Sequence, residues 1–350
     1  MKKATLYLLM ACHLVLASCA VAPPVTERFY WPPPPDRPRI EWIKAYSSQL
    51  DIERSSAQRF FAAIMGGDAP ISLLKPIEVK SLPDLKRFYV SDVGRAAVLV
   101  FDLDKHELRS LATPEGAPPI VHPLSIVSDR DNNLYVLERR SSTILVFDSS
   151  ERYLRAIRLK TASISSPVAL AIDQKKGRLY VSDAATRRIV VLDLLGVVQN
   201  SIGSAGQFNL PVALVINSKG QIIVADAFDA NIQIFDADGK FLSRFGRRGD
   251  SVGDFQLIKS VAVDSSDNIY VVDGRSHSVS VFNEQGELLL VLGGFYAVSG
   301  SGKVAPGGFS VPIGIDIDST DRMYVVDQLN ARVQVFQYLS DSYLRNHPAQ

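Results

Sequence analysis

The sequence predicts an all-β chain that folds as one six-bladed β-propeller. A four-residue motif, consisting of an aromatic or aliphatic residue, Val, any residue and an acid, occurs six times and ends at Asp92, Glu138, Asp183, Asp226, Asp273 and Asp327. The spacings between successive copies are 46, 45, 43, 47 and 54 residues. Apolar residues around each copy alternate with a period of two, which is typical of strands and excludes helical repeats. Four short strands per unit cannot bury both faces alone, so we expect the units to pack around a ring.

The chain begins with the features of a secretory signal peptide. Lys2 and Lys3 precede an apolar run that ends near Leu16 and is too short to span a membrane comfortably. The run leads into Leu-Ala-Ser-Cys19, which is similar to a bacterial lipobox. This resemblance implies that residues 1–18 are removed and that Cys19 is acylated, with palmitate-type chains holding the protein in a membrane. Ala20 follows in place of Asp, which favours the outer membrane, facing the periplasm. An ordinary signal peptide with a chance cysteine is the alternative.

Residues 19–38 form a predicted linker. Seven prolines lie between positions 23 and 38. Because proline lacks the amide hydrogen and fixes φ, the segment favours a stiff polyproline spacer without helix or sheet.

The ends of the repeat region predict how the ring closes. The sixth unit stops near Tyr338 after three strands, whereas residues 39–46 alternate like a strand without a partner. We therefore expect 39–46 to complete the sixth blade and remove an exposed sheet edge. Between this strand and the repeats of 75–340, a capping box at Ser55 to Gln58 predicts one short helix in the insertion 51–74. Residues 341–350 are predicted to be a tail.

The units resemble NHL repeats over residues 75–340. The family signature is Pro-x-Gly-aliphatic-Ala-aliphatic-Asp, then Tyr-Val-x-Asp, then a basic residue before aliphatic-Gln-aliphatic-Phe. Pro167 to Asp173 matches the first part well, and Ile232 to Phe235 matches the last. The first two copies are the most eroded. The resemblance implies a six-bladed propeller.

Composition limits the function classes. Lys and Arg total 38 against 37 for Asp and Glu, a formal net charge of +1, which argues against nucleic acid as a partner. Both cysteines, Cys12 and Cys19, lie in the first twenty residues, so the body has no disulfide or thiolate metal site. The histidines show no metal-ligand spacing and no nucleophile motif is present, so no catalytic residue and no cofactor is predicted.

The six repeated acids have a structural interpretation. Their fixed place after the second strand suggests that they accept backbone N–H groups in the following turn. Alternatively, they pair with the basic residue just beyond, which is Arg95, Arg140, Arg187, Arg275 or Arg332.

Two candidate sites depart from the repeat. First strands carry small or aliphatic residues at two positions, but unit one has Glu78 and Lys80 there and unit six has Asp316. Because these units become neighbours, the three groups should converge beside the channel, as a salt bridge or as a polar site. The longest join contains Phe295, Tyr296 and Lys303, which form a recognition loop or simply a longer linker.

These observations favour a lipid-anchored, exported scaffold that holds an envelope protein or a small ligand. The alternative is a metal-dependent propeller enzyme of lyase or lactonase type, with a divalent metal at the channel mouth.

Overall fold

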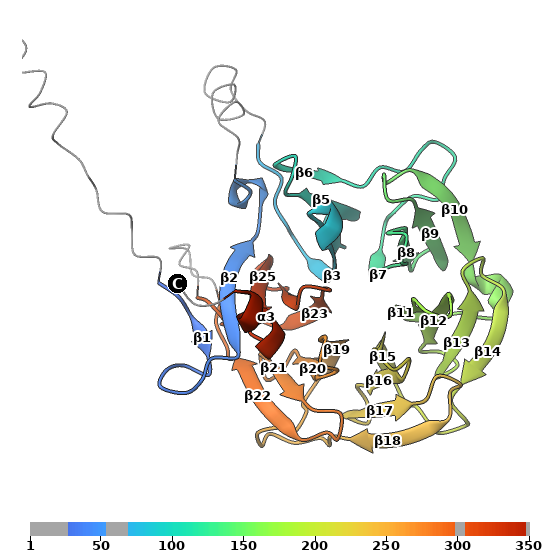
Figure 1. The fold of residues 1–350 in the computed structure, drawn as a ribbon. Helices are drawn as coiled ribbons and strands as arrows, with labels where there is room; N and C mark the ends of the chain where they lie inside the picture. The colour runs from blue at the N-terminus through green and yellow to red at the C-terminus, as the bar shows by residue number, and fades with distance from the viewer. Residues whose placement is uncertain (1–26, 54–68, 298–304, 348–350) are drawn as a thin grey trace, which may run out of the picture.

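The computed structural model describes residues 27–53, 69–297 and 305–347, and it shows six antiparallel sheets arranged around a central axis (Figure 1). The predicted six-bladed, all-β fold is confirmed. The signal peptide, Cys19, the capping box at Ser55 and Lys303 lie outside the described residues.

Each of the first five blades is a four-stranded sheet whose strands follow one another in the sequence. Blade one contains β3 (Pro76–Leu82), β4 (Arg87–Asp92), β5 (Ala97–Asp102) and β6 (Glu107–Ser110); blade two contains β7 (Pro123–Ser128), β8 (Leu134–Glu138), β9 (Thr143–Phe147) and β10 (Tyr153–Arg158). Blade three contains β11 (Pro167–Asp173), β12 (Arg178–Asp183), β13 (Arg188–Asp193) and β14 (Val198–Ile202); blade four contains β15 (Pro211–Ile216), β16 (Ile222–Asp226), β17 (Asn231–Phe235) and β18 (Phe241–Phe245). Blade five contains β19 (Ile258–Val263), β20 (Ile269–Asp273), β21 (Ser278–Phe282) and β22 (Leu288–Gly293).

Blade six joins the two ends of the chain. Its inner strands are β23 (Pro312–Ile317), β24 (Arg322–Asp327) and β25 (Arg332–Tyr338), and its outer strands are β2 (Ile40–Tyr46) and β1 (Tyr30–Trp31). β2 runs antiparallel to β25, from Ile40 opposite Tyr338 to Tyr46 opposite Val333. The predicted closing strand is therefore confirmed, and it leaves no open edge between the chain ends.

The prediction that residues 19–38 contain no sheet is wrong at Tyr30–Trp31. β1 pairs with the start of β2, and Arg39 N donates to Trp31 O at 2.8 Å. The prolines at 32–35 and 38 lie in the connection between β1 and β2, where they displace no ladder hydrogen bond. The predicted tail begins with a short helix, α3 (Asp341–Asn346), with Ser340 as its N-cap.

A bulge recurs at the start of the innermost strands. In every blade the register between the first and second strands shifts after the first paired residue, as between Pro76 and Glu78 or Pro312 and Gly314. Proline begins five of these six strands, where its missing N–H removes nothing from the ladder. The shift directs the next residues of each first strand toward the axis.

The core lies between the blades. Six clusters of buried apolar side chains each combine residues of two neighbouring blades, for example Phe88 and Val90 of blade one with Val326 and Val333 of blade six. Each sheet therefore buries both faces against its neighbours, which explains the nearly continuous apolar second and third strands.

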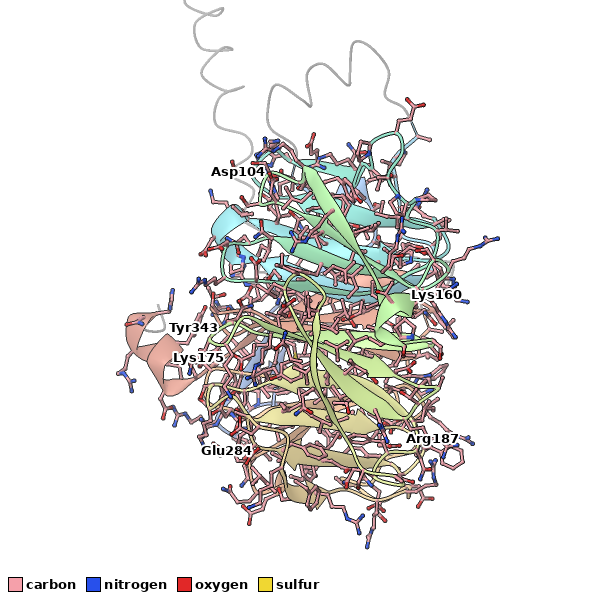
Figure 2. All side chains as sticks on the ribbon, turned by 90° about the vertical axis from the view of Figure 1, so that its right-hand side faces the viewer. Asp104, Lys160, Lys175, Arg187, Glu284 and Tyr343 are labelled. Carbon is pink, nitrogen blue, oxygen red and sulfur yellow. The ribbon has the colours of Figure 1, made fainter. Side chains whose placement is uncertain are left out.

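The ring has two faces with different connections. The join face carries the links between blades and the turns between second and third strands; the opposite face carries the other turns and α3. Short 3-10 turns occur at η1 (Gln49–Asp51), η2 (Pro83–Leu85) and η3 (Leu159–Ala162). Figure 2 shows Lys160 and Arg187 on the join face, with Lys175, Glu284 and Tyr343 on the opposite face. Among the described residues, no helix has the length and apolarity needed to cross a membrane.

Candidate functional site

The six motif acids organise the join face. Asp92 is buried and accepts hydrogen bonds from the backbone N–H groups of Leu74 at 2.7 Å, Lys75 at 3.0 Å and Arg95 at 3.1 Å. The same pattern holds at Asp226 and Asp273, so the predicted role as acceptors in the following turn is confirmed. The sequence interpretation missed the bonds to the join that precedes the first strand. These carboxylates are committed to the backbone and are not a ligand ring.

The alternative interpretation, pairing with the basic residue beyond the acid, is right only in blade six within the described chain. Arg332 Nε lies 2.8 Å from Asp327 Oδ2, and both side chains are buried. Arg95 bonds instead to Ser72.

The central channel is a cavity of about 360 Å³ lined by the first strands of all six blades. Most of its wall is aliphatic or small. Among the described residues, the charged ones that line the cavity belong to blades five, six and one, and these are Lys259, Asp316, Glu78 and Lys80. The charged part of the channel is therefore confined to one side, whereas uncharged polar residues such as Ser125 and Gln174 also line the other side.

The structure brings Lys80 and Asp316 into direct contact between blades one and six. Lys80 Nζ lies 2.8 Å from Asp316 Oδ1, and Ser81 N donates to Asp316 Oδ2 at 2.7 Å. The side chains are 22% and 14% exposed, so solvent screens the pair only partly. Both carboxylate oxygens of Asp316 have partners.

Glu78 lies beside this pair and does not join it. Its Oε1 accepts a hydrogen bond from Val79 N at 3.2 Å. Burial, together with the neighbouring charge of Asp316, raises the pKa of Glu78 to about 8 despite the Val79 bond and Lys80. The carboxyl packs against blade six where Gly314 lacks a side chain, since a Cβ there would be 3.1 Å from Oε1. Below its pKa, Glu78 is a neutral acid that can donate a hydrogen bond.

These groups do not fit a divalent metal. Such ions bind ionised carboxylates and carbonyl oxygens. Asp316 is occupied by an ammonium and a backbone N–H, and Glu78 keeps its proton at neutral pH. Within the described ranges, no three His, Cys, Asp or Glu side chains gather in a way that could hold an ion.

The structure separates the residues of the predicted recognition loop. Phe295 is 70% exposed, and its ring meets the edge of the His277 ring at a centroid distance of 4.9 Å. Tyr296 is half-buried, and its backbone is held by Phe309 O at 2.8 Å and by the Asn330 amide at 2.8 Å. Lys303 lies outside the described residues. Among the described residues of this join, Phe295 is therefore the large side chain that points outward.

Phe295 belongs to a larger apolar surface that the sequence interpretation missed. We call it the apolar join surface, and it consists of Leu74, Phe228, Val252, Leu257, Phe295 and Leu329, with exposed fractions from 38% to 82%. All six lie on the join face in blades four, five, six and one. Phe228 and Leu329 occupy the same repeat position, two residues after the motif acid. The sequence could therefore have indicated that these two residues lie on one face. Exposed basic residues occur around the whole join face, with Arg139, Arg140, Lys160 and Arg187 in blades two and three and Arg95, Arg247 and Arg275 in blades one, four and five.

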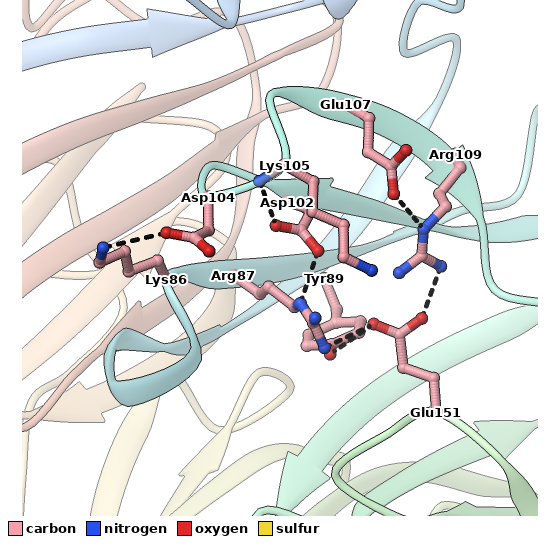
Figure 3. Close-up of polar contacts among 9 residues, drawn as sticks. All are labelled: Lys86, Arg87, Tyr89, Asp102, Asp104, Lys105, Glu107, Arg109 and Glu151. Atoms are coloured by element: carbon pink, nitrogen blue, oxygen red, sulfur yellow. Dashed lines mark hydrogen bonds and ion pairs between the residues drawn. The ribbon is translucent and has the colours of Figure 1, made fainter.

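A second charged cluster joins blades one and two on the opposite face (Figure 3). Glu151 Oε2 lies 2.5 Å from Arg109, while its Oε1 accepts from Tyr89 Oη at 3.0 Å and lies 3.3 Å from Arg87. Arg87 also binds Asp102 at 2.7 Å. Burial and the charge of Glu151 raise the pKa of Tyr89, so the phenol stays a donor. The charged groups of this cluster pair with one another, and we interpret it as a clamp that holds blade one against blade two.

Comparisons with known proteins agree with the fold. A family model described as a 6-bladed beta-propeller matches residues 210–289. A streptogramin B lyase has a similar structure, with TM-score 0.57 and 10% identity over 77% of this chain and 95% of that chain. A protein of unknown function from Bacteroides thetaiotaomicron matches with TM-score 0.60 and 14% identity, over 85% of this chain and 75% of that chain. A catalytically inactive virginiamycin B lyase from Staphylococcus aureus, solved with quinupristin, matches with TM-score 0.56 and 9% identity, over 79% of this chain and 86% of that chain.

Identities this low show the fold alone. No curated protein matches the sequence.

Proposed function

We propose that this chain is an exported, lipid-anchored propeller of NHL-repeat type that binds a protein partner of the cell envelope through its join face. The observation that carries the proposal is the apolar join surface. Exposed apolar residues scattered singly are ordinary, but a group on one face, rimmed by polar residues, is typical of protein interaction sites. Phe228 and Phe295 supply the aromatic side chains that are enriched at interfaces.

The backbone beneath this surface is firmly held. Arg248 donates to the carbonyl oxygens of Phe228 at 2.8 Å and Gln256 at 3.0 Å. One guanidinium thus ties the turn that carries Phe228 to the join that carries Val252 and Leu257. A surface fixed in this way loses little conformational entropy on binding.

Membrane attachment rests on Cys19 and its lipobox-like context. Acyl chains contribute about 0.8 kcal/mol per buried methylene, so two or more chains anchor a protein stably. We expect the outer membrane, facing the periplasm. Replacing Cys19 with Ser should move the protein from the membrane fraction to the soluble fraction, and retention in the membrane would contradict the anchor.

The lyase or lactonase alternative receives weaker support. The lyases named above share the fold at 9–10% identity, and the channel carboxyls of this chain do not present a metal site. Elemental analysis of the purified protein distinguishes the two functions, because stoichiometric calcium or zinc would favour the enzyme.

The docking proposal is tested by site-specific photocrosslinking in native membranes. A crosslinking residue at Phe295 should capture one consistent protein, identified by mass spectrometry, whereas one at Lys175 on the opposite face should not. The pair Phe295→Ser and Leu329→Ser should abolish a capture made from position 228. Leu289→Ser, an exposed residue of the outer strand β22, is the matched control and should leave it intact. Equal capture from both faces would contradict the proposal.

A further inference from the structure

The channel has the size and the lining of a small-molecule site. Its volume of about 360 Å³ falls at the lower end of the range for ligand pockets, roughly 300–1,000 Å³. Such pockets combine apolar walls with a few convergent polar groups. Among the described residues, the charged groups of the lining come from blades five, six and one. The first strands of blades two, three and four that face them are mostly aliphatic, with Ser125, Ser128 and, just after β11, Gln174 as uncharged polar residues.

Lys259 is the unexplained charge in this cavity. The equivalent positions of the other blades hold Ile77, Leu124, Val168, Val212 and Ile313. Lys259 is half-buried, and within the described chain it makes no hydrogen bond and no ion pair. A partly buried ammonium without a counter-charge is costly. We therefore expect a group that is not part of the described chain to supply a counter-charge or a hydrogen-bond acceptor to the Lys259 ammonium.

Lys259 and Glu78 approach the same strand of blade six from its two sides. A Cβ on Gly274 would lie 3.2 Å from Lys259 Cε and 3.3 Å from the carbonyl oxygen of Pro312, so Lys259 lies beside Pro312. Glu78 lies beside Gly314. Two residues along a strand span about 7 Å. The side chains of Lys259 and Glu78 therefore flank one short stretch of β23, between Pro312 and Gly314, at the end of the strand that begins on the join face.

The net charge around this stretch of β23 is positive. Lys80 and Asp316 neutralise each other, and Glu78 is uncharged at neutral pH because burial raises its pKa to about 8. The ammonium of Lys259 remains, together with an acid O–H that can donate to an anion. A carboxylate accepts both kinds of bond, and charge-assisted hydrogen bonds are the stronger ones.

We propose that the channel binds a small aliphatic carboxylate, with its carboxylate group held between Lys259 and Glu78 and its apolar chain along the aliphatic walls. This is a small-molecule site separate from the apolar join surface, so neither proposal depends on the other.

Titration calorimetry of the purified full chain tests the site with octanoate as the probe and with octanol and octylammonium as matched controls. Octanoate should bind at least tenfold more tightly than either control. Lys259→Met should reduce that affinity at least tenfold, and it should fold because aliphatic residues occupy the equivalent positions. Lys160→Met, on the join face away from the channel, should bind as the wild type does. Equal binding of octanoate and octanol, or unchanged affinity in Lys259→Met, would overturn the proposal.

A second measurement tests Glu78 in the same site. The charged groups around Glu78 are Lys80 on its own strand and Asp316 and Lys259 across β23, whereas β7 on its other side has no titratable residue. Raising the pH from 7 to 9 should ionise Glu78 and weaken octanoate binding several-fold in the wild type. Glu78→Gln keeps a donor and does not titrate, so its affinity should stay constant over this range. The same pH loss in both proteins would remove Glu78 from the proposal.

Discussion

Blade one and blade four meet their neighbours in different ways. Both bury apolar side chains at each junction, but blade one adds charged groups on both sides. Lys80 binds Asp316 of blade six, and Arg87 and Arg109 bind Glu151 of blade two. The interblade pairs of blade four, such as Lys219 with Glu284, lie on the exposed opposite face. This ring therefore orients its first blade with partly buried ion pairs, and its fourth blade by packing and by uncharged donors such as Ser218, whose N–H donates to Asp267 Oδ1 at 2.9 Å, and Ser182, whose Oγ donates to Pro211 O at 2.5 Å.

Buried pairs of this kind fix geometry more than they add stability. Removing one partner leaves an uncompensated charge, whereas replacing both with apolar residues is often nearly neutral. This asymmetry makes the comparison testable.

Removing the closing strand should have the largest effect. Deletion of residues 39–46 removes the packing of Ile40, Trp42 and Tyr46 against the ring, and burial of such side chains is worth about 1.5–3 kcal/mol each. We expect at least about 5 kcal/mol of lost stability, seen as a large fall in Tm. Truncation after Ser340, which removes the mostly exposed α3, is the control and should change Tm little. An unchanged Tm in the first deletion would show that blade six closes without β2.

Glu151→Gly tests the clamp between blades one and two. Glu151 has φ of 64°, and the equivalent turn positions hold Gly196, Gly239 and Gly286, so the change relieves strain worth about 1 kcal/mol. Loss of the buried ion pairs costs about 3 kcal/mol. Urea denaturation should show a net loss of about 2 kcal/mol. Glu284→Ala, in the exposed pair, should leave the unfolding midpoint unchanged, and a stabilised Glu151→Gly would refute the clamp.

Asp316→Ala tests the junction between blades six and one. It leaves Lys80 without its counter-ion and Ser81 N–H without its acceptor, at a cost of about 1.5 kcal/mol. The double variant Lys80→Val with Asp316→Ala restores the residue types found at this position in the other four blades. A double-mutant cycle by urea denaturation should show that the double variant recovers most of the loss. Simple additivity would mean that the pair is not coupled.

Glu78 should make the stability of the fold depend on pH. Its pKa is about 8 in the folded chain against an ordinary value of 4.5, so over this range the folded state keeps a proton that the unfolded state loses. Stability should therefore fall as pH rises from about 4.5 to 8 and level off above. Glu78→Gln does not titrate, so it should flatten this slope and be more stable than the wild type at pH 8, measured by urea unfolding at several pH values. Parallel slopes would contradict the raised pKa.

Most of the fold could be predicted from the period of the sequence repeat. The six motif copies located every second strand, and the unmatched alternation at 39–46 located β2, because both signals depend on side-chain periodicity. β1 has two residues next to a run of prolines, too short to show any period. Glu151 was missed because its partners come from another blade, although its place among turn glycines is visible in the sequence. Glu78, Lys80 and Asp316 were expected to converge, and Lys80 and Asp316 do form an ion pair. The neutral state of Glu78 beside this pair could not be predicted, because it results from burial that no sequence pattern reports.

The pairing of β2 with β25 also sets the order in which the molecule can be completed. Trp42 binds Gln334 across 292 residues of chain, and β2 is among the first segments to leave the ribosome while β25 is among the last. Contacts of such long range form slowly, and unpaired strand edges are prone to wrong association until they close. The last blade therefore cannot mature during synthesis, and the chain must be protected until its C-terminal strands are released.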